Sequence, residues 1–167
     1  MAQHQRPQTQ SAPYITPEGY QGLQQELNGL WQRRATVTQA LAAAAAEGDR
    51  SENAEYIYRK KELREIDRRI RYLQKRLPAL TVVRDPPGDR GRIYFGAWVR
   101  LEDKDGKLKD YRIVGPDEFD LKRGHISVDS PLARALLKKT ADEEVTVQTP
   151  QGPASFYVIN IRYGGTD

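Results

Sequence analysis

Apolar residues recur at heptad spacing in the first half of the chain, which predicts a long helix. From Tyr20 onward they follow one another at alternating intervals of 3 and 4 residues, with one basic member. These positions are Tyr20, Leu23, Leu27, Leu30, Arg34, Val37, Leu41 and Ala44. Thr16 is a good N-cap, Pro17 suits the first helical position, and Glu18 suits the positive end of the helix dipole. The pattern predicts a helix that starts after Thr16 and packs along one stripe.

A second stripe with the same spacing predicts a partner helix, and Pro78 would end it. Its positions are Glu52, Tyr56, Arg59, Leu63, Ile66, Ile70, Leu73 and Leu77. If Tyr20 faces Leu77 in an antiparallel pair, the chain reverses between Gly48 and Asp49, and Gly48 suits a left-handed C-cap. Each arm then has 28 residues, roughly 42 Å of helix. Residues 14–80 are therefore predicted to form an antiparallel two-helix coiled coil.

The period changes after residue 80, which predicts a second domain of a different class. Residues 81–92 read as a linker, because RDPPGDRGR contains two prolines and two glycines. Five short segments then read as strands: IYFGAWVRL, DYRIVG, HISVD, EVTVQT and SFYVINIRY. Two of the joints, DKDG at 103–106 and TPQG at 149–152, read as hairpin turns. Ser130 and Pro131 begin a short helix, so residues 93–167 are predicted to be α+β with a mostly antiparallel sheet.

Composition limits the remaining possibilities. Residues 1–13 form a polar segment that we expect to be a disordered tail. The chain has no cysteine, which excludes disulfides and thiolate metal sites. We expect no signal peptide and no membrane span, because no apolar run is long enough, and therefore a cytoplasmic location.

The predicted turn between the two helices crowds acidic residues together in the sequence EGDRSENAEY, residues 47–56. Asp49 and Glu52 stand at the spacing of a capping box for the second helix. They also have the oxygen ligands that Mg²⁺ prefers, although two carboxylates beside Arg50 would not hold the ion tightly alone. An ion site here would need ligands from another molecule. The spacing is compatible with both interpretations.

The second arm is basic, with ten lysines and arginines against five acids from Arg50 to Leu77. Arg59, Lys60 and Lys61 follow the predicted turn by two helical turns, where they could hold a polyanion. Tyr56 and Tyr58 could stack a base. The alternative is a solvated coiled-coil face with ion pairs at i,i+4 spacing. His4 and His125 have no partner at catalytic or metal spacing, so the sequence predicts no self-contained active site.

Four separated blocks, in this order, resemble the bacterial Gre transcript-cleavage factors. They are ITPEGYQGLQQELNGLW, GDRSENAEY, KKELREIDRRIRYL and SPLARALLKK, and the resemblance extends over residues 14–163. GDRSEN together with LREIDRRIRYL is more similar to the GreB branch than to GreA. The resemblance implies an N-terminal antiparallel coiled coil followed by an FKBP-like domain.

The resemblance also implies a partner and a mechanism. The C-terminal domain would dock at the rim of the secondary channel of bacterial RNA polymerase, through Asp129, Ser130 and Pro131. The coiled coil would bring Asp49 and Glu52 to the polymerase active centre, where they would help to hold the second Mg²⁺ and position a water. A basic patch would contact the extruded 3′ end of the nascent RNA; its members would be Arg59, Lys60 and Lys61.

The implied protein is an accessory factor, not an enzyme. It would activate cleavage of backtracked RNA by the polymerase, bind no metal stably by itself, and act as a monomer. Glu47, an extra acid before the tip glycine, favours an alternative, a Gre-like inhibitor that occupies the channel. A structural coiled-coil adaptor without a polymerase contact is a third interpretation. Asp49 and Glu52 favour the cleavage factor.

Overall fold

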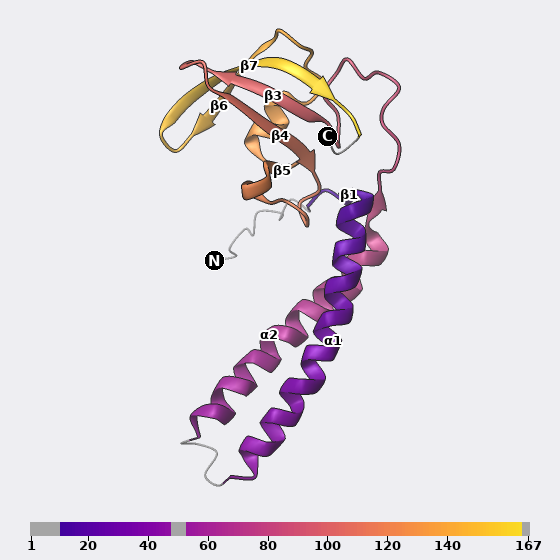
Figure 1. The fold of residues 1–167 in the computed structure, drawn as a ribbon, viewed down its shortest axis with the longest axis vertical. Coiled ribbons are helices and arrows are strands. Elements are labelled where there is room, and N and C mark those ends of the chain that lie inside the picture. The colour runs from indigo at the N-terminus through magenta and orange to yellow at the C-terminus, as the bar shows by residue number, and fades with distance from the viewer. Residues whose placement is uncertain (1–10, 48–52, 165–167) are drawn as a thin grey trace, which may run out of the picture. The chain divides into compact units, whose positions relative to one another are not determined.

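The computed structural model describes residues 11–47 and 53–164, and it confirms the predicted α+β class (Figure 1). The chain divides into two compact units. One is Tyr20–Leu80, and the other combines Met1–Gly19 with Thr81–Asp167. Within the described ranges, no helix has the length and apolar character needed to cross a bilayer.

The first unit is a helical hairpin. Helices α1 (Pro17–Ala45) and α2 (Ala54–Arg76) run side by side in opposite directions, and a short 3-10 helix, η1 (Leu77–Ala79), follows (Figure 1). Val37, Ile66 and Ile70 are buried between them, with Leu27, Leu30 and Leu63 packed against this core. All six belong to the two predicted stripes, so the heptad prediction is confirmed for the centre of the hairpin.

Ion pairs flank the apolar stripe and cross from one helix to the other. They are Arg69–Glu26 at 2.9 Å, Arg34–Asp67 at 2.7 Å and Arg33–Glu62 at 2.5 Å. Arg34, the basic member of the first stripe, is thus held by a carboxylate of the facing helix. Partly exposed pairs of this kind contribute about 0–1 kcal/mol each. Their main effect is to favour one register of the two helices over others.

The second unit is built on a five-stranded sheet in the order β5-β4-β3-β7-β6. The strands are β3 (Trp98–Asp103), β4 (Leu108–Val114), β5 (His125–Ser127), β6 (Glu144–Thr149) and β7 (Gly152–Arg162). Only the β4–β5 pair is parallel among these neighbours. Helix α3 (Pro131–Leu136) contributes Ala133 and Leu136 to the same core as Val99, Leu101 and Val158. A 3-10 helix, η2 (Leu121–Arg123), precedes β5.

One predicted strand is shorter than its sequence suggested. The run IYFGAWVRL does not become extended until Trp98, because Gly96 has a φ of 87° and turns the chain. The Gly96 amide donates to the Ile113 carbonyl at 2.7 Å, which anchors this turn against β4. Ile93 and Ala97 are nevertheless fully buried. The apolar pattern therefore predicted burial correctly and the extended conformation wrongly. Similarly, the predicted strand HISVD ends at Ser127.

Two short strands were not predicted: β1 (Tyr14–Ile15) and β2 (Thr81–Val82), which pair in parallel. The residue after β1, Thr16, caps α1 by accepting a hydrogen bond from the Gly19 amide at 3.1 Å. Its own amide and hydroxyl donate to the Glu118 carboxylate, the amide at 2.7 Å. Glu118 also accepts from the Gly115 amide at 3.2 Å. This carboxylate therefore ties the first turn of α1 to the loop after β4.

A side chain at Gly19 would displace the Glu118 carboxylate from this contact. A Cβ atom there would lie 2.5 Å from Oε1 of Glu118, whereas a Cβ at Gly22 would meet no atom within 4 Å. The same substitution in one helix should therefore have opposite effects at the two positions.

We predict that Gly22→Ala stabilises the protein by about 0.5–1 kcal/mol, because alanine favours the helix over glycine. Gly19→Ala should instead destabilise it by about 1–2 kcal/mol, because the displaced Glu118 carboxylate loses hydrogen bonds to Thr16. Urea unfolding followed by far-ultraviolet circular dichroism measures both. Equal stabilisation by the two variants would contradict this role of Glu118.

Candidate functional site

The two acids that the sequence singled out, Asp49 and Glu52, lie outside the described residues, which resume at Asn53. The flanking residues are informative. Helix α2 begins at Ala54, and its N-cap is Asn53, whose Oδ1 accepts a hydrogen bond from the Tyr56 amide at 3.1 Å. The N-cap of the described helix is therefore Asn53, while the capping box predicted at Asp49 and Glu52 falls outside the described residues. Asparagine is among the best N-cap residues, and here it supplies the cap.

Asn53 makes a second hydrogen bond that crosses to the other helix. Its Nδ2 donates to the Ala44 carbonyl at 2.7 Å, one of the last four carbonyls of α1, which have no partner in a regular helix. Ala44 and Asn53 lie at equal sequence distances from the predicted reversal between Gly48 and Asp49. The register of the two helices thus agrees with the prediction from the heptad pattern, while the reversal itself lies outside the described residues.

Sequence reasoning missed Asn53, although a signal was present. An asparagine directly before a run of helix formers, with Glu55 in the first turn, is typical of a helix start. The heptad stripe extended further back, through Glu52, and obscured this boundary. The bond to Ala44 depends on tertiary structure and had no local signal.

In the predicted basic cluster, Arg59 is held by ion pairs, and Lys60 and Lys61 are less constrained. Arg59 forms ion pairs with Glu55 at 2.8 Å and with Glu62 at 3.1 Å. The hydrogen bond that Arg59 donates to Glu55, together with the charges of both carboxylates, raises the pKa of Arg59. Glu62 also binds Arg33 of the facing helix. The Arg59 guanidinium is therefore engaged in the hairpin's own network.

Lys60 and Lys61 are exposed on α2. The Lys60 ammonium lies 5.7 Å from the ring centre of Tyr56, and the Arg59 guanidinium lies 5.4 Å from that of Tyr58. Tyr58 is 59% exposed. This stretch of α2 thus presents lysines and an aromatic ring to solvent, the combination that binds single-stranded nucleic acid through phosphate attraction and base stacking.

The three residues expected to dock on a partner lie at the start of α3. Ser130 is its N-cap and accepts from the Ala133 amide at 3.2 Å, as predicted, and Pro131 is exposed. The Asp129 carboxylate accepts from the Ala12 amide at 3.0 Å. All three are partly or fully accessible, but the hydrogen bonds give Asp129 and Ser130 structural roles as well.

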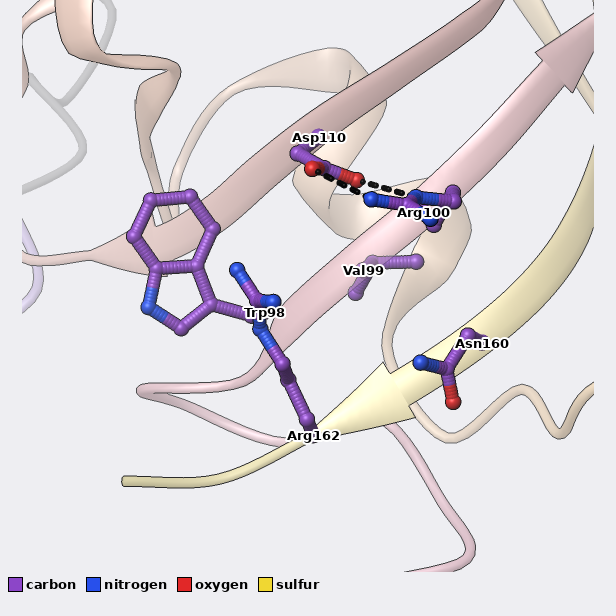
Figure 2. Close-up of a pocket in the computed structure, with 6 residues that line it drawn as sticks. All are labelled: Trp98, Val99, Arg100, Asp110, Asn160 and Arg162. Atoms are coloured by element: carbon purple, nitrogen blue, oxygen red, sulfur yellow. Dashed lines mark hydrogen bonds and ion pairs between the residues drawn. The ribbon is translucent and has the colours of Figure 1, made fainter. Parts of the chain in front are cut away.

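A shallow pocket on the sheet is a further candidate site (Figure 2). The Arg100 guanidinium donates two hydrogen bonds to the Asp110 carboxylate there, at 2.9 and 3.1 Å. This interaction lowers the pKa of Asp110. The Arg162 guanidinium lies over the Trp98 ring, 5.1 Å from its centre. Because the carboxylate is held by Arg100, the pocket offers no free general base.

His125 is the one histidine in the described part of the chain, and its surroundings favour a structural role. It is 8% exposed and packs edge-on against Trp98, with ring centres 5.5 Å apart. Burial lowers its pKa, assisted by the charges of Arg123 and Arg112. Across residues 11–47 and 53–164, no cluster of three or more histidines, cysteines or acids could hold a metal ion.

Comparison with known proteins assigns both units. A family model described as "Transcription elongation factor, N-terminal" matches residues 13–82. A second, "Transcription elongation factor, GreA/GreB, C-term", matches residues 88–163. Together the two models match most of the chain.

Individual relatives agree with these models. The chain is 58% identical over 164 residues to transcription elongation factor GreB of Pseudomonas aeruginosa, covering 98% of each chain. It is 57% identical over 151 residues to GreB of Yersinia pestis, covering 90% of this chain and 88% of the relative. A solved structure of the transcription factor Gfh1 is 27% identical and covers 89% of this chain and 96% of that chain. Its TM-score of 0.43 is too low to support a structural conclusion.

The environment of His125 leads to a prediction about pH. Its pKa in the folded protein should lie below the usual 6.5, and Arg123→Gln should raise it. Because the folded state then binds fewer protons than the unfolded chain, this group's contribution to stability is lost as the pH falls below about 6.5. Nuclear magnetic resonance titration in a His4→Gln background, which leaves one histidine, measures the pKa. An unchanged pKa in Arg123→Gln would contradict the assigned contribution of that charge.

Proposed function

Because this chain belongs to the GreA/GreB family of transcription elongation factors, we propose that it stimulates cleavage of backtracked RNA by bacterial RNA polymerase. The hairpin would enter the secondary channel of the polymerase, and Asp49 and Glu52 would act in its active centre. The new RNA 3′ end would then lie in position for synthesis to resume. The chain would be a cytoplasmic accessory factor, and the polymerase would perform the chemistry.

The observation that carries this proposal is the bond between Asn53 and Ala44. It draws the end of α1 to the start of α2 at 2.7 Å, and the acidic segment 48–52 connects these two ends in the sequence. The hairpin arms are long, since α2 alone has 23 residues, about 35 Å. A thin pair of helices with acids in its connecting segment is suited to reach a catalytic centre that belongs to another protein.

The proposed acids fit a shared magnesium site. Two carboxylates are a common protein contribution to a Mg²⁺ site, and the remaining ligands are usually waters and substrate phosphates. Mg²⁺ held there would supply charge stabilisation at the scissile phosphate and a more acidic bound water. Asp49 and Glu52 would contribute oxygen ligands, and either could accept a hydrogen bond that orients the attacking water. The other ligands would come from the polymerase and the RNA.

We propose that the extruded RNA runs along α2 and meets Lys60 and Lys61 first. Both lysines are exposed, whereas Arg59 already forms ion pairs with two carboxylates. Arg59 would contribute to RNA binding only to the extent that these carboxylates release it. Tyr58 would stack on a base. This arrangement makes Glu62 a modulator of the grip on RNA.

The polymerase-docking role of Asp129, Ser130 and Pro131 is also a proposal. The exposed Pro131 is the best placed of the three for a direct contact, since its side chain has no structural hydrogen bond to make. Asp129 would need to release Ala12, or to bind the partner through the carboxylate oxygen that does not accept the Ala12 amide.

We predict that Asp49→Asn and Glu52→Gln each reduce cleavage of backtracked RNA by at least about 100-fold, a loss typical of removing one charge-stabilising group. Binding to the polymerase should remain. Glu47→Gln, the same kind of change next to the acidic segment, is the control and should retain cleavage. The assay follows end-labelled RNA in purified backtracked complexes with Mg²⁺, alongside a competition measurement of binding.

Cleavage at the wild-type rate by both Asp49→Asn and Glu52→Gln would refute the role of these acids. If the wild type instead slows nucleotide addition on unpaused complexes, releases no short RNA, and Glu47→Gln relieves this, the inhibitor is the correct function.

We predict that Glu62→Gln strengthens the factor's grip on extruded RNA, because Arg59 loses one of its two carboxylate partners. Crosslinking of the RNA 3′ segment to the factor should increase two- to fivefold, about 0.4–1 kcal/mol, the range of an exposed ion pair. Glu65→Gln changes the net charge equally and lies on the same helix, without contacting Arg59, so it is the control. An equal increase in both variants would show a general charge effect and exclude a specific release of Arg59.

A further inference from the structure

Trp98 lines the shallow pocket on the sheet (Figure 2), and it stands between two arginines of the neighbouring strands. Val99 and Leu101 are buried in the core that α3 shares, so alternation along β3 places Trp98 on the opposite face. In register, Trp98 lies opposite Arg112 of β4 on one side and Arg162 of β7 on the other. Residues directly opposite in this way have Cβ atoms about 4.5–5.5 Å apart. One aromatic ring is therefore flanked by a cation on each side.

Both arginines keep hydrogen-bond donors available. Arg162 is exposed, and its guanidinium lies over the Trp98 ring, 5.1 Å from the ring centre. Arg112 donates from Nε to a backbone carbonyl at 3.3 Å, which leaves its terminal nitrogens available. In the part of the chain that the structure describes, neither arginine forms an ion pair with a carboxylate. The Asp110 carboxylate is already bound by Arg100. This part of the sheet face therefore carries a net positive charge.

An indole between two cations fits a nucleotide that lies within a single strand. Bases stack on aromatic side chains, and guanidinium groups bind phosphate oxygens through paired hydrogen bonds. A nucleotide inside a strand has a phosphate on each side of its base, which matches the cations on both sides of Trp98, whereas a free mononucleotide has one phosphate group. Asn160 also lines the pocket and is exposed, so its amide can bind the edge of a base. An acidic peptide would match the charge but not the ring.

We propose that this face of the sheet binds single-stranded nucleic acid, with one base stacked on Trp98 and the phosphates on either side held by Arg112 and Arg162. The base would take the place of the Arg162 guanidinium on the ring, and the guanidinium would turn to the neighbouring phosphate. This exchange replaces a cation–π contact by base stacking and gives the cation a charge-assisted hydrogen bond. The site contains no residue of the hairpin, so the inference goes beyond the proposed function and does not depend on it.

Tryptophan fluorescence can report on this site alone. The chain has two tryptophans, Trp31 and Trp98, so Trp98 is the one remaining fluorophore of this kind in a Trp31→Phe background. Nucleic acid that binds only to the hairpin then leaves the signal unchanged. The probe is a short oligoadenylate RNA, titrated into the full chain, and we expect it to quench Trp98 through stacking. The logarithm of the binding constant should fall with the logarithm of the salt concentration with a slope of about −1.4, roughly 0.7 for each of two phosphates.

Three substitutions in this background each lower the net charge by one and separate the site from a general effect of charge. Arg162→Gln removes one phosphate contact, and Asn160→Asp places a carboxylate in the pocket. Both positions are exposed, and among the described residues neither side chain makes a hydrogen bond, so the fold should tolerate both changes. Each should weaken RNA binding at least about fivefold, because a charge-assisted bond is lost or opposed. Arg134→Gln is the control, at an exposed position of α3, and should change binding less than about twofold.

Several results would overturn the inference. One is that the RNA leaves Trp98 fluorescence unchanged. Another is an equal loss of binding in all three variants, which would indicate a general effect of charge. Polyglutamate that displaces the RNA as effectively at equal charge concentration would identify an acidic protein segment as the ligand. Adenosine monophosphate that binds as tightly as the oligomer would identify a free nucleotide. The measurement includes no RNA cleavage, so none of these results bears on the proposed function.

Discussion

The hairpin depends on a single apolar stripe shared by two helices. Val37, Ile66 and Ile70 are buried there, and in the described residues of this unit no second layer packs on the outer face of either helix (Figure 1). The outer faces must therefore be polar, which accounts for much of the 30% charged residues in the chain. The stripe, the flanking ion pairs and the bond from Asn53 all agree on one register of the two helices.

The same constraint shapes the charge on α2. A solvated helix face with many basic residues is favoured when carboxylates of the same or the facing helix compensate them. Arg34, Arg59 and Arg69 are compensated in this way. Lys60 and Lys61 come next to Arg59 in the sequence and are more exposed. The hairpin can thus keep a net positive surface at Lys60 and Lys61, where we propose that RNA binds, while its arginines are compensated by carboxylates.

Local sequence signals predicted local structure well. Thr16 and Ser130 are the helix caps that their residue types indicated, and the turns at 103–106 and 149–152 connect paired strands. The heptad spacing predicted the helix register.

Other features had no local signal. The turn at Gly96 was predicted as strand, because an apolar run has the same pattern whether it is extended or turned. The partners of Asn53 and Glu118 could not be predicted, because their hydrogen bonds join residues 9 and 102 positions apart. The proposed roles of Asp49 and Glu52 rest on the family resemblance, since their spacing is equally typical of a helix cap.

The central claim is that this chain completes a metal site in another protein. The most direct test is the Mg²⁺ dependence of RNA cleavage in purified backtracked complexes, measured with and without the chain. If the two acids supply ligands, the chain should lower the Mg²⁺ concentration that gives half-maximal cleavage, and Asp49→Asn with Glu52→Gln should restore the higher value. A half-maximal concentration that the wild-type chain leaves unchanged would contradict the account.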